Sequence, residues 1–172
     1  MGGIDVANAV AVDGAGYTYL TGETTSIHFP TTPGAFDSTC GTDGLCNGDN
    51  DAFVAKLTSH GTRVWVTYIG GGRGEKPTGI AVDTTGHAYI TGWTSSPTYP
   101  VSPLSGAPTL KTPFAFITKF NQSGSGLVYS VRFCSGCFGD DLALRDRART
   151  TLQLWLDGVV PLGQSFVALQ SK

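Results

Sequence analysis

The amino-acid sequence predicts an all-β fold built from two four-stranded antiparallel units. The chain has 172 residues, of which 40% are hydrophobic, so it holds enough apolar material for a core. Its 24 glycines and nine prolines leave little room for long helices and suit short strands joined by turns. The chain also repeats itself, and the repeated blocks contain the predicted strands.

Three blocks of sequence recur in the same order. The recurring pairs are 10–22 with 80–92, 29–30 with 99–100, and 52–57 with 115–120. The first two pairs are 70 residues apart and the third is 63 apart, because the second copy lacks seven residues in the loop after the aromatic-proline dipeptide. Repeats of this length that are rich in short strands are typical of β-propellers.

Each copy is predicted to contain four strands. They fall at 8–13, 17–22, 52–57 and 63–69 in the first copy, and at 79–83, 87–94, 114–120 and 126–133 in the second. The first two strands of each copy are joined by Asp-x-x-Gly, starting at Asp13 and Asp83, in which Asp caps a tight turn and Gly accepts a positive φ. Four antiparallel strands make one propeller blade.

Aromatic residues recur at equivalent strand positions. The pairs are Tyr19 with Tyr89, Phe53 with Phe116, and Trp65 with Tyr129. Large aromatic side chains contribute much of the apolar contact in a core. We therefore expect these residues to form the layers between stacked blades.

The repeats divide the chain into blade 1 at 1–71, blade 2 at 72–141 and an irregular C-terminal segment at 142–172. Residues 145–172 carry only two of the 24 glycines, and no Asp-x-x-Gly turn occurs there. The segment is a degenerate third repeat or a divergent tail, and its pattern fits a strand or a helix. Two blades do not close a ring, so the sequence predicts a partial, unclosed β-propeller that is a fragment or associates with copies of itself.

The repeated blocks resemble a known family. The run IAVD-x-x-G-x-AYITG, an aromatic-proline loop, AFVAK, and a glycine turn leading to TYIGG follow one another over roughly residues 2–141. This order is similar to the bacterial β-propeller repeat called SBBP. The resemblance implies a secreted or cell-surface protein with a propeller of about seven blades and a binding or scaffolding role. It supplies no catalytic residues.

Charge and hydropathy exclude two classes of partner. The formal net charge is -2, and no basic run precedes position 145, so we expect no nucleic-acid partner. No apolar run approaches the length of a membrane span. The first residues also lack the charged and apolar regions of a signal peptide.

The four cysteines fall as two close pairs, Cys40 with Cys46 and Cys134 with Cys137. This spacing is compatible with short disulfide loops and favours an extracellular or cell-surface location. The second pair also has the spacing of redox and zinc sites. However, it follows a predicted strand instead of beginning a helix, and two further zinc ligands are missing from its surroundings in the sequence.

One loop has part of the pattern of a calcium site. The candidate ligands are Asp43, Asn47, Asp49 and Asp51, and the last three have the spacing of alternate ligands in a calcium loop. Ala52 replaces the turn glycine, and Thr58 stands where the bidentate Glu belongs. A polar loop stapled by Cys40 and Cys46 is therefore the preferred interpretation, calcium is the alternative, and no other cofactor is expected.

The sequence predicts a non-enzymatic scaffold that binds a protein or a glycan. The polar residues that could be catalytic have structural explanations as turn caps, blade-rim charges or exposed turn residues. These are Asp13, Asp83, Lys56, Lys119, His28, His60 and His87. The alternative is a fragment of a propeller-fold hydrolase or lyase whose active site needs further blades.

Overall fold

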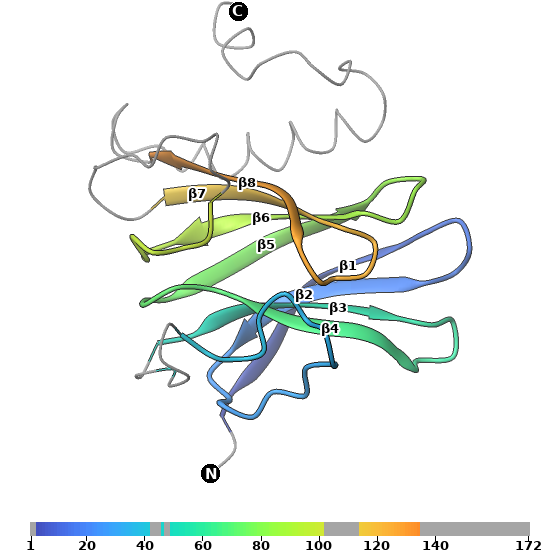
Figure 1. Cartoon of the computed structure of the whole chain (residues 1–172), viewed down its shortest axis with the longest axis horizontal. Coiled ribbons are helices and arrows are strands. Elements are labelled where there is room, and N and C mark those ends of the chain that lie inside the picture. The colour runs from blue at the N-terminus through green and yellow to red at the C-terminus, as the bar shows by residue number, and fades with distance from the viewer. Residues whose placement is uncertain (1–2, 42–45, 47–48, 102–113, 135–172) are drawn as a thin grey trace, which may run out of the picture.

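The computed structural model describes residues 3–41, 46, 49–101 and 114–134, which form two four-stranded antiparallel sheets (Figure 1). The strands of blade 1 are β1 (Asp5–Val12), β2 (Thr18–Thr24), β3 (Asp51–Leu57) and β4 (Arg63–Ile69). Those of blade 2 are β5 (Glu75–Val82), β6 (Ala88–Thr94), β7 (Phe114–Phe120) and β8 (Leu127–Cys134). Each strand pairs with the next along the chain, as the blade prediction requires, and the described part contains no helix.

The two sheets fall within the predicted ranges 1–71 and 72–141, and the C-terminal segment 142–172 lies outside the described residues. The first strand of each blade begins earlier than the sequence pattern predicted, at Asp5 and Glu75. Both strands continue through a bulge, between Ala7 and Ala9 in β1 and between Pro77 and Gly79 in β5. Proline and glycine in a sequence suggest an interruption, but a bulge absorbs them within a continuous strand.

The sheets stack face to face, and the main core lies between them (Figure 1). Blade 1 contributes Tyr19, Val54 and Trp65 to this core, and blade 2 contributes Ile90 and Phe116. The prediction of aromatic layers between blades is confirmed for these three aromatic residues. Each blade thus has two unlike faces, and only one face of each blade lies in the interface between them.

The remaining repeated aromatics lie on the faces that point away from this interface. Phe53 packs against Phe29, with ring centroids 4.5 Å apart, on the far side of blade 1. Tyr89 contacts Tyr129, with ring centroids 6.5 Å apart, on the far side of blade 2. These three residues lie outside the interface between blades 1 and 2, because a residue and its repeat counterpart occupy the same face of successive blades and only one of the two meets this interface.

The predicted turn caps are confirmed. The Asp13 carboxylate accepts hydrogen bonds from the backbone N–H groups of Ala15 and Tyr17, each at 2.9 Å. Gly16, which closes this turn, has φ 83°, and Gly86 closes the matching turn after Asp83 with φ 84°. The tight turns β1–β2, β3–β4 and β5–β6 lie at one end of the stack, and the β4–β5 linker lies at the other (Figure 1). We call the linker end of the stack the loop end.

Candidate functional site

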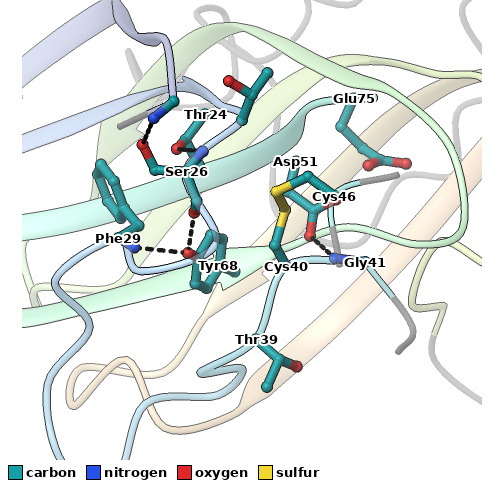
Figure 2. The surroundings of a disulfide bond; sticks show 12 residues. Thr24, Ser26, Phe29, Thr39, Cys40, Gly41, Cys46, Asp51, Tyr68 and Glu75 are labelled. Atoms are coloured by element: carbon teal, nitrogen blue, oxygen red, sulfur yellow. Dashed lines mark hydrogen bonds between the residues drawn. A yellow bond between two sulfur atoms is a disulfide. The ribbon is translucent and has the colours of Figure 1, made fainter. Parts of the chain in front are cut away.

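A disulfide joins Cys40 and Cys46 at the loop end of blade 1 (Figure 2). Both cysteines are buried and pack against Tyr68, with Phe29 alongside. The structure thus places the expected pair at disulfide distance, with the two Cα atoms 5.1 Å apart. Cys134 ends β8, and Cys137 lies outside the described residues, so the second pairing stays a prediction.

The Tyr68 hydroxyl holds the aromatic-proline loop of blade 1 in place. It donates a hydrogen bond to the Ser26 carbonyl at 2.5 Å and accepts one from the Phe29 N–H at 2.9 Å (Figure 2). In blade 2 the equivalent position is Arg132, which donates to the carbonyls of Ser96 and Pro97 at 3.1 and 2.7 Å. The Tyr68 phenol and the Arg132 guanidinium therefore hold equivalent loops from the same position of the two repeats.

Two carboxyl groups are buried together between the disulfide loop and blade 2 (Figure 2). Asp51 begins β3 and is 3% exposed, and Glu75 begins β5 and is 0% exposed. The two groups lie near enough for each to affect the pKa of the other. Asp51 also accepts the Gly41 N–H at 2.9 Å, and Glu75 accepts the Thr94 hydroxyl at 2.6 Å.

Burial raises the pKa of both acids, because the charged form loses its hydration there. The pKa of Asp51 rises to about 7, with nearby Asp37 adding to the effect of burial. The pKa of Glu75 rises to about 8, with the neighbouring Asp51 charge adding to the effect of burial. Because the charge of Asp51 raises the pKa of Glu75, the two carboxyl groups titrate as a coupled pair.

The structure leaves the calcium site a prediction. Asp43 and Asn47 lie outside the described residues. Asp49 is exposed, whereas Asp51 is directed to Gly41 and Glu75. Asp49 and Asp51 line a small cavity, whose other walls are Gly41, Cys46, Gly71, Gly72 and Arg73. Within the described ranges no three acidic, histidine or cysteine side chains are placed to hold a metal ion.

The sequence did not reveal Glu75 as the partner of Asp51. Asp51 stands out in the sequence only for its spacing to Asn47 and Asp49, and no motif marks Glu75. The two residues meet because the linker Gly70–Gly74 folds back over the start of β3. That fold brings Gly71 within hydrogen-bond reach of Glu75, at 3.4 Å.

A second polar cluster lies at the end of blade 2 that carries the tight turns, opposite the loop end. We call this the turn end. The Asp83 carboxylate accepts hydrogen bonds from the Tyr89 hydroxyl at 3.0 Å and faces the Lys119 ammonium at 3.2 Å. Burial alone would raise the pKa of Asp83, but hydrogen bonds from Thr85 and other neighbours hold it well below its usual range. Lys119 also donates to Tyr89, and the contacts raise its pKa against the opposing effect of burial, so the amine stays protonated.

The cluster recurs in blade 1 with one difference. Asp13 accepts a hydrogen bond from Tyr19 at 3.1 Å, while the Lys56 ammonium lies over the Tyr17 ring at 4.3 Å from its centroid. The sequence identified Asp13 as a turn cap and Lys56 as a rim charge, but not their shared contact with Tyr19. The repeat offsets of 70 and 63 residues align Asp13, Tyr19 and Lys56 with Asp83, Tyr89 and Lys119. This alignment is the sequence signal that could have indicated one such cluster in each blade.

The three histidines lie apart from one another. His28 and His60 are exposed, as predicted. His87 differs, because it is partly buried and its Nδ1 atom lies 3.3 Å from the Asp83 carboxylate. The compact Asp-x-x-Gly turn brings residues four apart together, which explains the contact.

The two stacked sheets each have four antiparallel strands and share two features. One is the Asp-x-x-Gly turn cap, and the other is the side chain, Tyr68 or Arg132, that holds the loop after the second strand by hydrogen bonds. This arrangement defines a β-propeller repeat protein. Residues 64–97 match the family model of the SBBP beta-propeller repeat, over β4, the linker, β5 and β6. The chain thus contains a repeat of the SBBP family, in agreement with the resemblance in the sequence. No curated protein is significantly similar to the chain. In the part of the chain described, no helix has the length and apolar character needed to cross a membrane.

Proposed function

We propose that this chain is a non-enzymatic β-propeller segment of a secreted or cell-surface protein, and that it binds a protein or glycan through polar loops at the loop end of its blades. Loops on a rigid sheet framework are the usual carriers of binding. The disulfide is compatible with an extracellular location.

The observation that carries this proposal is that equivalent polar residues do the same structural work in both blades. Thr21 donates its hydroxyl to the Phe53 carbonyl at 2.7 Å, and Thr91 donates to the Phe116 carbonyl at 2.9 Å. The hydrogen bond from a tyrosine hydroxyl to the turn aspartate also recurs. Tyr19 donates to Asp13 in blade 1, and Tyr89 donates to Asp83 in blade 2. An enzyme would place unlike polar residues at equivalent positions around its site, whereas these residues stabilise each blade.

The blades differ most in the loop between their second and third strands. Blade 1 carries the disulfide there, and Ser38, Thr39 and Asp49 are exposed around it. Asp37 stabilises this loop by accepting the Thr39 N–H and hydroxyl, both at 2.9 Å. Exposed hydroxyl and carboxylate groups held on a stapled loop suit hydrogen bonding to sugar hydroxyls or to peptide groups.

The test is a binding screen of the full chain, with the disulfide intact, against a glycan array and a panel of secreted proteins. We expect a ligand whose affinity falls when Ser38→Ala and Thr39→Ala are combined. The matched control combines Thr62→Ala and Thr84→Ala, which removes exposed hydroxyls at the turn end. Equal losses in both double variants would contradict binding at the loop end.

The same panel tests the enzymatic alternative. Incubating the full chain with glycan and peptide substrates is expected to give no turnover. Cleavage that increases in proportion to protein concentration and disappears in a loop-end variant would overturn the scaffold proposal. In that case the hydrolase or lyase interpretation would replace it.

A further inference from the structure

Arg132 places a positive charge inside blade 2. The side chain belongs to β8, near the loop end, and is only 8% exposed. By strand register its position matches that of Tyr68 in blade 1. The neutral phenol of Tyr68 is sufficient to hold the loop of blade 1 by two hydrogen bonds. Holding the loop therefore requires neither the charge of Arg132 nor its additional N–H groups.

The loop uses only one part of the Arg132 guanidinium. Both hydrogen bonds, to the carbonyls of Ser96 and Pro97, come from Nη1. The Nε–H group is buried, and no acceptor among the described residues lies within hydrogen-bond distance of it. In a guanidinium, Nε–H and one N–H of Nη2 point in the same direction, and this pair matches the two oxygens of a carboxylate. The edge of Arg132 that can hold a carboxylate is therefore not used by the loop.

The charge of Arg132 has no ion-pair partner in the described part of the chain. In blade 1 the strand position beside Thr24 holds the carboxyl group of Asp51. The equivalent position of blade 2, beside Thr94, holds Phe114. Burial lowers the pKa of Arg132 because the charged form loses hydration, but a guanidinium stays protonated in proteins. A buried cation is costly unless an anion accompanies it.

The Phe114 ring limits the direction from which an anion can approach. The Arg132 Cζ atom lies 5.0 Å from the centroid of this ring, so the ring covers one face of the guanidinium. An aromatic ring stabilises a cation over its face, but it carries no net charge that could balance the cation. An anion therefore binds in the plane of the guanidinium, at the edge formed by Nε and Nη2.

We propose that Arg132 forms a carboxylate-binding site near the loop end of blade 2, in which one carboxylate accepts hydrogen bonds from Nε–H and Nη2–H. A singly charged group suits the site better than a phosphate dianion, because one guanidinium balances one negative charge. The groups that contact Arg132, which are Ser96, Pro97 and Phe114, add no second positive charge.

The carboxylate can come from two sources, a bound acidic ligand or the chain itself. The next carboxyl groups along the sequence after β8 are those of Asp140 and Asp141. In both cases the same two N–H groups of Arg132 hold the carboxylate. The site is separate from the ligand contacts proposed for Ser38 and Thr39, since those residues belong to blade 1, so either proposal can fail alone.

The test follows the Arg132 Nε–H signal in proton–nitrogen correlation NMR spectra of the full, isotope-labelled chain, assigned through its bonds to the Arg132 backbone. Sodium acetate and sodium glucuronate are added in separate titrations. The controls are sodium chloride at the same ionic strength and uncharged glucose. We expect both carboxylates to shift the signal to saturation and both controls to leave it in place. The Nε–H signal of the exposed Arg73 should not saturate in any titration.

Arg132→Tyr is the matched variant, because Tyr68 shows that a phenol holds the equivalent loop. This variant should keep the melting temperature of the unchanged chain and lose any increase in melting temperature that acetate or glucuronate produces. If the variant does not fold, the titration of the unchanged chain still decides the question, because it needs no substitution.

A chain that combines Asp140→Asn with Asp141→Asn identifies the source of the carboxylate. Saturation in the unchanged chain supports a site for an added ligand. Saturation only in the double variant supports a site that Asp140 or Asp141 fills in the unchanged chain. Absence of saturation in both chains, or equal shifts with chloride, would overturn the proposal.

Discussion

The Asp51–Glu75 pair shows how two single residues make the stability of this protein depend on pH. Both carboxyl groups are buried, and each has a native pKa well above the ordinary value of 3.8 or 4.5. The folded state therefore holds protons that the unfolded state releases, so this contribution is complete below about pH 4 and is lost as pH rises through 7 and 8. Position in the sequence could not reveal this, because the pairing depends on how the linker folds over β3.

We predict that the free energy of unfolding falls by at least about 2 kcal/mol between pH 6 and pH 9. Denaturant unfolding across this pH range measures it. Glu75→Gln keeps an acceptor for Thr94 and removes one titrating group, so its stability should vary less with pH. A Glu75→Gln profile as steep as that of the unchanged protein would contradict the assignment.

At the scale of the strand, the first strand of each blade depends on a close backbone approach at a bulge. A Cβ atom on Gly92 would collide with the Lys76 carbonyl, and one on Gly22 would collide with the Val6 carbonyl. The sequence predicted the eight strands well because the same pattern occurs twice. It missed the early starts at Asp5 and Glu75, since a bulge is set by strand pairing and not by local residue preference.

We predict that Gly92→Ala destabilises the protein by about 1–3 kcal/mol, because backbone atoms of β5 must move to admit the methyl group. Gly14→Ala is the matched control: its Cβ would meet nothing within 4 Å, and Gly14 is not among the positive-φ glycines. Thermal and urea unfolding of both variants measures the difference. Equal stabilities for the two variants would show that the bulge can relax without cost.

At the scale of the whole molecule, one interface joins the blades, and Trp65 lies within it. The indole stacks on Phe120, with ring centroids 6.2 Å apart, contacts Tyr19 edge-on at 6.3 Å, and donates to blade 2. The sequence placed Trp65 between blades correctly. It could not say which of the two faces of a blade Phe53 or Tyr129 would occupy, because both faces carry aromatic residues.

We predict that Trp65→Ala lowers the free energy of unfolding by about 3–5 kcal/mol and separates the unfolding of the two blades. The adjacent Val64, which is 43% exposed, supplies the control, and Val64→Ala should change stability by less than about 1 kcal/mol. Hydrogen exchange of the strands in each blade measures whether they still open together. Common opening of all eight strands in Trp65→Ala would show that the rest of the interface is sufficient to couple the blades.

The difference between the two faces of a blade also gives any array of such blades a direction. Val10 and Val12 are exposed on the face of blade 1 away from blade 2, and in the interface the Trp65 indole donates to the turn carbonyl of Gln122. A blade joined the wrong way round would set Val10 and Val12 against Ile80 and Val82, and no indole or phenol would meet a turn carbonyl. Stacking is therefore head to tail, and the two ends of a row need different caps. An engineered cap for blade 1 must carry a Tyr and a Trp, whereas a cap for blade 2 must offer turn carbonyls.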